Sequence, residues 1–320
     1  MGHDSRVNGP PTPGTAAAPA PQAALVLVAH GATARVRLAS GEEVLARAAG
    51  RDLQFVCGDE VLCACDTQHG QWQMQQVTAR RTALYRTNAR GQSELVAANL
   101  TVLVVVLAPS PTPDLFLVDR YLAAASCAGM GALLLANKSE QAFAPEDEQG
   151  LSEYAALGLT VCRCSARSGT GLEVLREQLR GQAVMFVGQS GVGKSSLLRV
   201  LVPGSDAPVG ELLRSATGRH TTSTTRLYSL PGGGMLIDSP GVRDFAPAVA
   251  ALDPRALGFS EVAQHASQCR FADCQHLREP HCAVVAAVAA GAISARRYES
   301  YRRLRRLRAQ LLERAPYARR

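Results

Sequence analysis

Short apolar runs separated by turn residues dominate the chain between residues 23 and 81. Apolar and polar side chains alternate over residues 34–38, and a Ser-Gly turn follows at residues 40–41. This two-residue period predicts β-strands with one buried face, joined by a hairpin. About five short strands in so short a segment predict a small β-barrel of the OB type. Such barrels commonly bind oligonucleotides, although a purely structural β-domain fits the same pattern.

Beyond residue 98 the pattern changes to strands that alternate with helices, after a segment at 82–98 that we interpret as a linker. This alternation predicts a mostly parallel sheet that is covered by helices on both faces. Ligands of such sheets bind at the carboxyl ends of the strands. The expected strands lie near residues 101–108, 132–136, 159–164, 183–187, 226–230 and 235–237. The expected helices cover residues 114–127, 145–157 and 171–179, and a fourth begins near residue 194.

The two ends of the chain differ from its middle. Pro, Ala, Gly and Thr dominate residues 1–22, which predicts a disordered tail. Residues 247–320 have a helical pattern with Cys and His, and they end in an amphipathic helix. The apolar side of this helix comprises Tyr298, Tyr301, Leu304, Leu307 and Leu311. We therefore expect a multidomain protein with an OB-like β-barrel at 23–81, an α/β domain at 99–246 and an α-helical domain at 247–320.

Composition excludes several classes of protein. Hydrophobic residues make up 47% of the 320 residues and charged residues 19%, which rules out a wholly disordered or fibrous chain. No apolar run approaches the roughly 20 residues that span a bilayer, and the N-terminal sequence has no signal-peptide pattern. The nine cysteines are therefore expected to be reduced thiols or metal ligands in a cytoplasmic protein.

Positive charge is concentrated toward the C-terminus. The formal net charge is +7, whereas residues 283–320 alone contain ten Arg and two Glu, a net of +8. This asymmetry predicts a surface that contacts a polyanion such as RNA. The alternative is the solvated face of a helix, which is the usual place of a charge run. Lysine, by contrast, occurs only at positions 138 and 194 among the 34 basic residues, and both positions fall in nucleotide-binding motifs.

A phosphate-binding loop follows the expected strand at 183–187. The sequence GQSGVGKS at 188–195 fits the pattern G-x-x-x-x-G-K-[ST] and precedes a helical segment, as the motif requires. Glycines let backbone N–H groups surround the phosphates, Lys194 is expected to reach the β- and γ-phosphates, and Ser195 is expected to bind Mg²⁺. The expected nucleotide-binding residues here are Gly188, Gln189, Ser190, Gly191, Val192, Gly193, Lys194, Ser195 and Ser196.

Two further motifs suit the γ-phosphate side of such a site. DSPG follows an apolar strand, so Asp238 is expected in the Mg²⁺ shell and Gly241 beneath the γ-phosphate. The D-x-x-G pattern alone is a common turn, and its position after the phosphate loop is what favours function. In GRHTTSTT, at 218–225, Thr222 is the expected Mg²⁺ ligand, with Thr221 as the alternative.

A third motif has the features of base recognition. NKSE follows an expected strand and resembles the N-K-x-D sequence with which GTPases select guanine. In that motif the carboxylate accepts hydrogen bonds from the N1 and N2 donors of guanine. Here Asn137, Lys138 and Glu140 are the candidates, and Glu in place of Asp keeps the charge but changes its reach, which puts guanine selectivity in question. Ser165 and Ala166 match by position the turn that backs the base.

The order of these motifs is the most specific feature of the sequence. The base-recognition elements precede the phosphate loop, whereas ordinary GTPases have the reverse order. With ARRTALYR at 79–86, AAN at 97–99 and VDRYL at 118–122, the chain resembles the circularly permuted GTPases and, more narrowly, the ribosome small subunit-dependent GTPase A family. The resemblance covers about residues 23–308. It implies an OB-fold, a permuted GTPase domain, a zinc domain and a role in late maturation of the small ribosomal subunit.

Cys269, Cys274, His276 and Cys282 form a candidate metal site with the spacing C-x4-C-x-H-x5-C. Three thiolates and one imidazole are typical of a closed, structural Zn²⁺ site. His281 is an alternative ligand to His276, although its position beside Cys282 suits it less. The resemblance implies the same zinc motif, with one ion per chain.

The motifs and the resemblance together predict hydrolysis of GTP with Mg²⁺. Lys194, Thr222 and His220 are the expected catalytic residues. Val242 occupies the position after D-x-x-G where many GTPases carry a water-positioning glutamine, so we expect slow intrinsic hydrolysis. His220 either positions the water instead, or contacts a partner or packs under the loop. The expected partners are GTP, GDP and the small ribosomal subunit with its rRNA, bound by a monomer that does not associate with membranes.

Two other functions are compatible with these motifs. One is a permuted GTPase that acts on the large ribosomal subunit, which the OB-like segment and the zinc motif disfavour. The other is an RNA-binding scaffold that senses a nucleotide, which is disfavoured by the intact Lys194, Ser195, Thr222 and Asp238.

Overall fold

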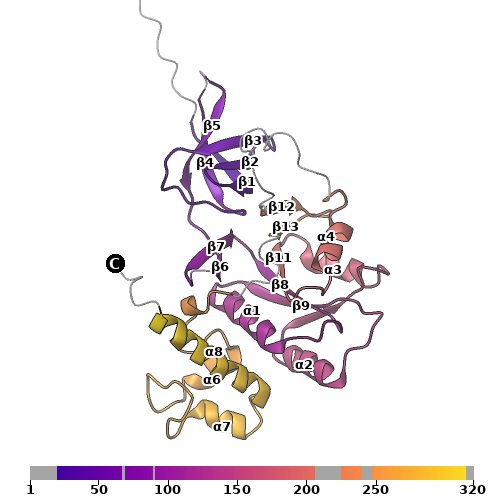
Figure 1. The fold of residues 1–320 in the computed structure, drawn as a ribbon, viewed down its shortest axis with the longest axis vertical. Helices are drawn as coiled ribbons and strands as arrows, with labels where there is room; N and C mark the ends of the chain where they lie inside the picture. The colour runs from indigo at the N-terminus through magenta and orange to yellow at the C-terminus, as the bar shows by residue number, and fades with distance from the viewer. Residues whose placement is uncertain (1–19, 67–68, 89–90, 206–224, 240–246, 315–320) are drawn as a thin grey trace, which may run out of the picture.

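The computed structural model describes residues 20–66, 69–88, 91–205, 225–239 and 247–314. Its first part is a closed barrel, in which the strands pair in the order β1-β2-β3-β5-β4 and β4 pairs back with β1 (Figure 1). These strands are β1 (Gln22–His30), β2 (Thr33–Leu38), β3 (Glu43–Ala48), β4 (Glu60–Asp66) and β5 (Gln71–Val77). The predicted barrel is thereby confirmed, and most of the predicted tail at 1–22 lies outside the described residues.

One face of the barrel strands forms the barrel core. Val26, Val36, Val61 and Met74 are completely buried there. Buried and half-buried positions alternate along β2, as the two-residue period of a strand requires when one face is covered. The alternating pattern therefore determined which residues fill the barrel.

The segment at 82–98 is a β-hairpin and not the linker that we predicted. Strands β6 (Ala83–Thr87) and β7 (Ser93–Ala98) pair antiparallel as a separate two-stranded sheet. Leu84 and Val96 are buried in a core that the hairpin shares with the α/β region. The prediction was wrong because a mostly polar stretch at 86–94 separates two short apolar runs, and only the folded chain provides the surface that these runs cover.

The α/β region contributes six strands to one large sheet, in the order β10-β9-β8-β11-β13-β12. Neighbouring strands are parallel, except that β12 and β13 form an antiparallel pair. The strands are β8 (Val102–Leu107), β9 (Gly131–Ala136), β10 (Thr160–Arg163), β11 (Ala183–Val187), β12 (Arg226–Ser229) and β13 (Met235–Asp238). The predicted parallel sheet and its final strand pair are confirmed.

Helices cover both faces of this sheet, also as predicted (Figure 1). Alternate residues of β8 point to opposite sides, so that Leu103 and Val105 belong to one core and Val104 and Val106 to the other. α1 and α2 pack on the first core, and α3 and α4 pack on the second. The helices are α1 (Leu115–Cys127), α2 (Pro145–Ala156), α3 (Leu172–Leu179) and α4 (Lys194–Leu201).

The barrel and the sheet meet at their edges. Val28 of β1 pairs with Arg226 of β12, so the two β-structures are continuous. The buried Cys57 thiol donates to the backbone oxygens of Leu27 and Thr225, each 3.1 Å from its Sγ. Burial raises the pKa of this thiol to about 12, so it stays protonated and able to donate.

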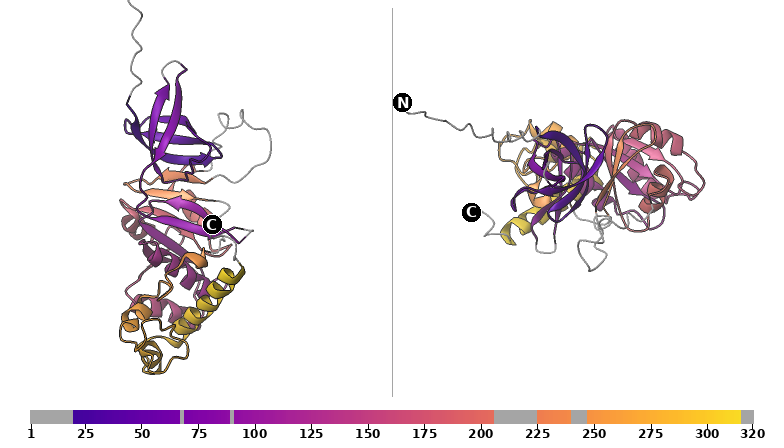
Figure 2. Two further views of the ribbon diagram at one scale, coloured as in Figure 1. Left: turned by 90° about the vertical axis from the view of Figure 1, so that its left-hand side faces the viewer. Right: turned by 90° about the horizontal axis from the view of Figure 1, so that it is seen from above.

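The C-terminal region packs against α1 (Figure 2). It comprises η2 (Val249–Ala251), α6 (Ser260–Ala266), α7 (Ala283–Ala289) and α8 (Ala295–Arg314). Tyr301 and Leu304 of α8 are completely buried in a core that also contains Ala123 of α1. The predicted apolar side of the last helix therefore faces this core. In the part of the chain that the structure describes, no helix has both the length and the apolar character of a membrane span.

A buried ionic network attaches α8 to the α/β region. Arg297, only 4% exposed, donates to Asp119 of α1 and to Glu261 of α6. Arg296 donates to the same Asp119 and to Glu153 of α2. Removing one partner of such a network leaves a buried charge unpaired, which costs about 3–5 kcal/mol. The network therefore fixes the C-terminal region on α1.

Candidate nucleotide site and metal centre

The phosphate-binding loop follows β11 and ends where α4 begins. Its glycines have positive φ angles, 135° at Gly188, 80° at Gly191 and 99° at Gly193. A Cβ atom on Gly188 would lie 2.1 Å from the backbone oxygen of Val106, so no other residue fits there. A Cβ atom on Gly193 would lie 2.3 Å from Nδ2 of Asn137. The glycine pattern is therefore required by the close approach of β8 and of the loop after β9.

Lys194 begins α4 with its ammonium group turned back into the loop. Its Nζ donates to the backbone oxygens of Gly188, at 2.5 Å, and Gln189, at 2.6 Å. The residue is largely buried, so carbonyl dipoles compensate a charge that water reaches poorly. Ser195 and Ser196 follow in the first turn of α4, where helix N–H groups have no partner within the helix. A positive charge and a helix N-terminus therefore meet at one point, which favours binding of an anion.

Asn137 connects the base-recognition motif to the phosphate loop. It follows β9 directly and is 1% exposed. Its Nδ2 donates to the backbone oxygen of Val192, 55 positions further along the chain, at 2.8 Å. Its Oδ1 accepts from the backbone N–H of Ala166 at 3.1 Å. One amide therefore holds together three motifs that the sequence keeps far apart.

A cavity of about 420 Å³ lies between these motifs. Ligand pockets of proteins commonly have volumes of about 300–1,000 Å³, so a nucleoside fits this size. Its lining residues are Asn137, Lys138, Glu140, Gln141, Ala166, Arg167, Gly193 and Ser196. Gln141 and Arg167 were missed by the sequence analysis. Each directly follows a motif, and adjacency to the motif was the only signal that could have found it.

Glu140 is held by the turn that follows β10. A hydrogen bond from the Ser165 side chain lowers the pKa of the Glu140 carboxyl group, and the charge of Arg167 acts in the same direction. The carboxylate is exposed and therefore stays ionised at neutral pH. An ionised carboxylate only accepts hydrogen bonds, so this side chain suits a ligand edge that carries N–H donors.

The segment between β8 and α1 forms a further wall beside the phosphate loop. Nζ of Lys138 donates to the backbone oxygen of Ser110 at 2.7 Å. The side-chain amide of Gln189 accepts from the N–H of Asp114, at 2.8 Å, and donates to the oxygen of Thr112, at 3.1 Å. Sequence reasoning missed this wall because backbone atoms make the contacts, and any sequence provides backbone atoms.

The remaining predicted residues are those expected on the γ-phosphate side. Asp238 ends β13, which is parallel to β11, so it lies at the same edge of the sheet as the phosphate loop. Ser239 directly follows Asp238, and its Oγ accepts a hydrogen bond from Oγ1 of Thr225 at 2.9 Å. Ser190 is exposed within the loop. The other predicted positions lie outside the described residues, namely His220, Thr221, Thr222, Gly241 and Val242.

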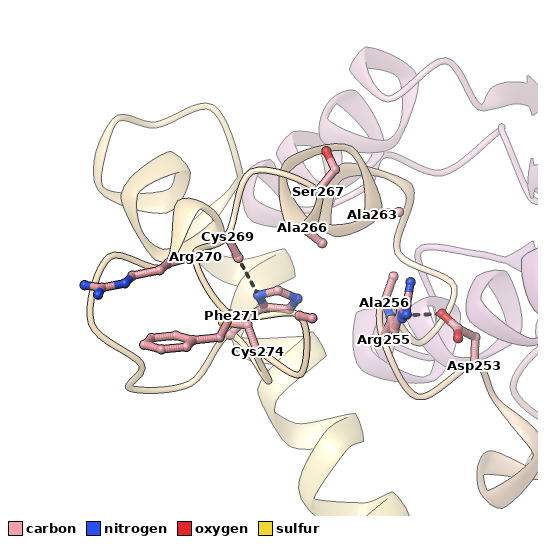
Figure 3. Close-up of a pocket in the computed structure, with 12 residues that line it drawn as sticks. Asp253, Arg255, Ala256, Ala263, Ala266, Ser267, Cys269, Arg270, Phe271 and Cys274 are labelled. Carbon is pink, nitrogen blue, oxygen red and sulfur yellow. Dashed lines mark hydrogen bonds between the residues drawn. The ribbon is translucent and has the colours of Figure 1, made fainter.

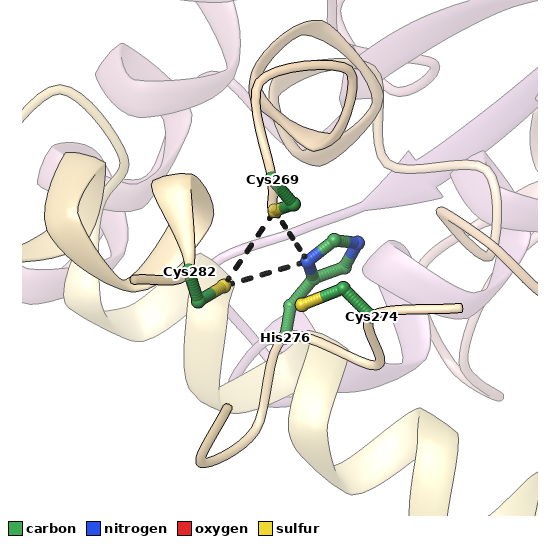
Figure 4. A group of neighbouring side chains, drawn as sticks. All are labelled: Cys269, Cys274, His276 and Cys282. Atoms are coloured by element: carbon green, nitrogen blue, oxygen red, sulfur yellow. Dashed lines mark hydrogen bonds between the residues drawn. The ribbon is translucent and has the colours of Figure 1, made fainter. Parts of the chain in front are cut away.

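The four predicted metal ligands come together (Figure 4). Cys269, Cys274, His276 and Cys282 place their ligand atoms within 4.8 Å of one another, and His281 is not part of this group. Sγ of Cys269 lies 3.9 Å from Sγ of Cys282, and these sulfurs are 3.4 and 3.5 Å from Nδ1 of His276. A tetrahedral Zn²⁺ needs separations of about 3.8 Å between sulfurs and about 3.5 Å between sulfur and nitrogen. Donor set and spacing therefore fit zinc.

Hydrogen bonds shape the loop that carries these ligands. The Glu279 carboxylate accepts from three backbone N–H groups between Gln275 and Arg278, at 2.8 to 2.9 Å. Burial raises the pKa of Glu279, but these bonds outweigh it and lower the pKa to about 2. The hydroxyl of Tyr298 in α8 donates to the backbone oxygen of His276 at 2.8 Å. The ligand loop is therefore held both by its own carboxylate and by the last helix.

A cavity of about 520 Å³ opens beside the metal cluster (Figure 3). Cys269, Cys274 and His276 form one side of it, and α6 contributes another. Arg270 stacks on the exposed ring of Phe271 at the rim, with 5.6 Å between the guanidinium carbon and the ring centroid. The cluster thus lies close to the surface, within reach of a small chelator.

Sequence comparisons give matches along most of the chain. The family model described as RsgA GTPase matches residues 77–247. The small ribosomal subunit biogenesis GTPase RsgA of Ectopseudomonas mendocina (strain ymp) is 44% identical over 254 residues, which are 77% of this chain and 73% of that protein. The protein of the same name from Pseudomonas fluorescens (strain SBW25) is 46% identical over 225 residues, 69% of this chain and 66% of that protein.

Two solved structures share the arrangement of the elements. The crystal structure of YjeQ from Thermotoga maritima matches with a TM-score of 0.69 and 27% identity, covering 94% of this chain and 100% of that one. The crystal structure of YloQ, described as a circularly permuted GTPase, matches with a TM-score of 0.68 and 22% identity, covering 92% and 96%. The barrel, the permuted sheet and the C-terminal helices therefore form a fold that is known from other proteins.

Proposed function

This chain belongs to the RsgA GTPase family, and from that premise we propose that it hydrolyses GTP to GDP and phosphate in the maturation of the small ribosomal subunit. The observation that carries the proposal is the Asn137 amide, which bonds both to the phosphate loop at Val192 and to the turn at Ala166. A base-recognition motif and a phosphate-binding loop thus meet at one edge of the sheet. A ligand with a guanine base and a phosphate chain requires this combination.

The phosphate-side motifs have distinct proposed roles. Lys194 neutralises charge that develops on the β- and γ-phosphates, while loop N–H groups bind their oxygens. Bound Mg²⁺ would supply further charge neutralisation between the same phosphates. Ser195 and Thr222 are its proposed ligands, Asp238 belongs to its outer shell, and Gly241 donates a backbone N–H to the γ-phosphate.

Base selection is assigned to Glu140 with Lys138. The carboxylate accepts from the N–H donors of guanine, and the aliphatic part of Lys138 lies along the base. The Ser165 bond and the Arg167 charge favour the ionised form of Glu140, which is the form that can accept twice. The extra methylene group relative to Asp is accommodated by the turn at Ser165.

His220 is our proposed water-positioning residue, because Val242 has no side chain that could hydrogen-bond to water. Without a glutamine at that place the isolated protein hydrolyses GTP slowly. Docking on the small subunit accelerates hydrolysis, and hydrolysis then releases the protein. The rate of GTP hydrolysis thereby sets how long the protein stays bound to one subunit.

The cluster of Cys269, Cys274, His276 and Cys282 is proposed to hold one structural Zn²⁺. Protein atoms supply all four ligands, so the ion organises the loop and leaves no position for a substrate. The 20-residue helix α8, with eight Arg and two Glu, is the proposed contact with rRNA. The protein acts as a monomer in the cytoplasm, with functional units at 23–81, 99–246 and 247–320.

GTP turnover measured with and without purified small subunits tests the proposal. We expect slow basal turnover that rises at least about tenfold with small subunits and does not rise with large subunits. ATP serves as the control for base selection and is expected to be hydrolysed much more slowly. Stimulation by large subunits alone would overturn the ribosomal assignment, and equal turnover of ATP would overturn the role of Glu140.

A further inference from the structure

Two arginines at the contact between α1 and α8 have no carboxylate partner within the described residues. They are Arg120 of α1 and Arg303 of α8. Their neighbours Arg296, Arg297 and Arg302, by contrast, all pair with Asp or Glu. The guanidinium groups of Arg120 and Arg303 also converge on the same aromatic ring.

Both guanidinium groups lie over one aromatic ring. The central carbon of Arg303 is 4.0 Å from the ring centroid of Phe116, and that of Arg120 is 6.0 Å from it. Burial lowers the pKa of Arg120, the charges of Tyr121 and Asp114 raise it, and the charge of Arg303 lowers it again. Nε of Arg120 is buried and has no hydrogen-bond partner in the described chain. The two guanidinium groups repel each other, so an anion that binds between them is attracted by both charges.

Phe116 makes this pair a preorganised site. The ring packs against the core between α1 and the C-terminal helices, so its position is fixed. The ionic network of Arg296 and Arg297 fixes α8 relative to α1. A cation–π contact orients a guanidinium group without neutralising its charge. The exposed Arg303 therefore loses little freedom when it binds a ligand, which favours affinity.

Positive charge continues along the same seam between the helices. Arg308 follows Arg303 by about one and a half turns of α8 and lies near Cys127 of α1. Burial raises the pKa of the Cys127 thiol, and the charge of the nearby Arg308 lowers it. Cys127 also lines a cavity of about 290 Å³ together with Arg81 and Tyr85. α8 runs along α1, and its C-terminal end is directed toward the part of the molecule that holds β6 and β7 (Figures 1 and 2).

We propose that the α1–α8 seam, formed by Phe116, Arg120, Arg303 and Arg308, binds the phosphodiester backbone of RNA. Guanidinium groups match phosphate oxygens in bidentate geometry, and such contacts do not depend on base sequence. The nearby ring of Tyr85 is 38% exposed and offers a stacking surface for a base, which favours RNA over an acidic protein. The identification of the anion as RNA rests on the proposed function. The convergence of the two arginines is a structural observation and does not depend on that function.

The test compares Arg303→Gln with Arg302→Gln, which remove the same charge from adjacent positions of α8. Arg302 pairs with Glu299 and is therefore the matched control. Binding of the full chain to a short mixed-sequence RNA duplex, and to purified small subunits, is measured over a range of salt concentrations. We expect Arg303→Gln to weaken both affinities about tenfold and to flatten the dependence of log affinity on log salt by about one unit. Arg302→Gln should change either affinity less than about twofold.

Basal GTP turnover and metal content should be the same in both variants, because neither arginine contacts the nucleotide pocket or the metal ligands. Phe116→Leu keeps the apolar contact but loses the ring, and we expect a loss in the same direction of about threefold. Equal losses for the two arginine variants would overturn the seam. Binding of the unmodified protein to the duplex but not to subunits would overturn the ribosomal function and keep the seam. Binding to neither RNA would overturn both.

Discussion

The candidate nucleotide site and the candidate metal centre of this protein are assembled in opposite ways. The candidate nucleotide site joins segments up to 77 positions apart, and protein groups already satisfy one another there, as Lys194 and Asn137 do through loop carbonyls. The metal centre lies within residues 269–282, and its four ligand atoms converge on one point. Where a site is already assembled without its ligand, changing a residue should impair the reaction and leave the fold intact. Where the bound ligand assembles the site, changing a coordinating residue should unfold the segment that carries it.

Lys194→Ala should give the largest effect and separate chemistry from fold. We expect GTP turnover to fall by about 10²–10³-fold, because the variant lacks the charge that stabilises the transition state. The thermal unfolding midpoint should shift by only a few degrees, since the sheet does not depend on this side chain. Arg199→Ala, at an exposed position of the same helix, is the control. Unchanged turnover would contradict the assignment of the phosphate loop.

Cys274→Ser should show the opposite behaviour at the metal centre. We expect loss of bound zinc and faster amide hydrogen exchange around residues 269–282, because metal binding supplies folding free energy there. Basal GTP turnover should stay within about threefold, since the nucleotide pocket shares no residue with the cluster. Cys127→Ser, which removes an exposed thiol outside the cluster, is the control. Metal analysis of protein purified without chelators that finds no zinc would refute this half of the comparison.

Asn137→Ala tests how far the nucleotide site is assembled by one side chain. The change leaves the oxygen of Val192 and the N–H of Ala166 unpaired, at a cost of about 1–3 kcal/mol. We expect GTP binding, measured with a fluorescent analogue, to weaken about tenfold or more, with metal content unchanged. Unchanged affinity would mean that the sheet alone positions the two motifs.

Glu279 offers the smallest and most specific test, through pH. Its pKa is lowered from about 4.5 to about 2 in the folded chain, so its contribution to stability is complete above about pH 4.5 and is lost as the pH falls toward 2. The stability advantage over Glu279→Gln should therefore be constant near neutral pH and shrink on acidification. Acid also releases metal from both proteins, and the difference between them isolates the carboxylate. If the stability difference between the unmodified protein and Glu279→Gln instead grew on acidification, the backbone hydrogen bonds could not be the cause of the low pKa.

Sequence reasoning identifies candidate residues most readily where neighbours in the chain are neighbours in space. The phosphate loop at 188–195 and the four metal ligands are contiguous patterns of this kind. The permuted order also predicted a sheet whose motifs meet, because the carboxyl ends of parallel strands share one edge whichever strand comes first. Spacing also favoured His276 over His281, which adjoins Cys282, and the structure brings His276 into the cluster.

Contacts that depend on packing or on backbone atoms were not predictable. The backbone oxygen of Ser110 accepts a hydrogen bond from Lys138, and no residue type at position 110 would predict this contact. The apolar residues of the β6–β7 hairpin form two short runs, and the surface that they cover exists only after folding. The meeting of Arg120 with Arg303 depends on how α8 lies on α1, which helical periodicity does not specify.

β12 is the last strand of the α/β sheet, and β1 of the barrel covers its free edge through Val28 and Arg226. An uncovered edge strand offers unpaired N–H and C=O groups to other chains, which is a route to aggregation. During synthesis the N-terminal part of a chain leaves the ribosome first and folds as a unit. The barrel can therefore fold before β12 has been synthesised. As soon as β12 forms, β1 can pair with its edge, which protects it from pairing with other nascent chains on the same mRNA.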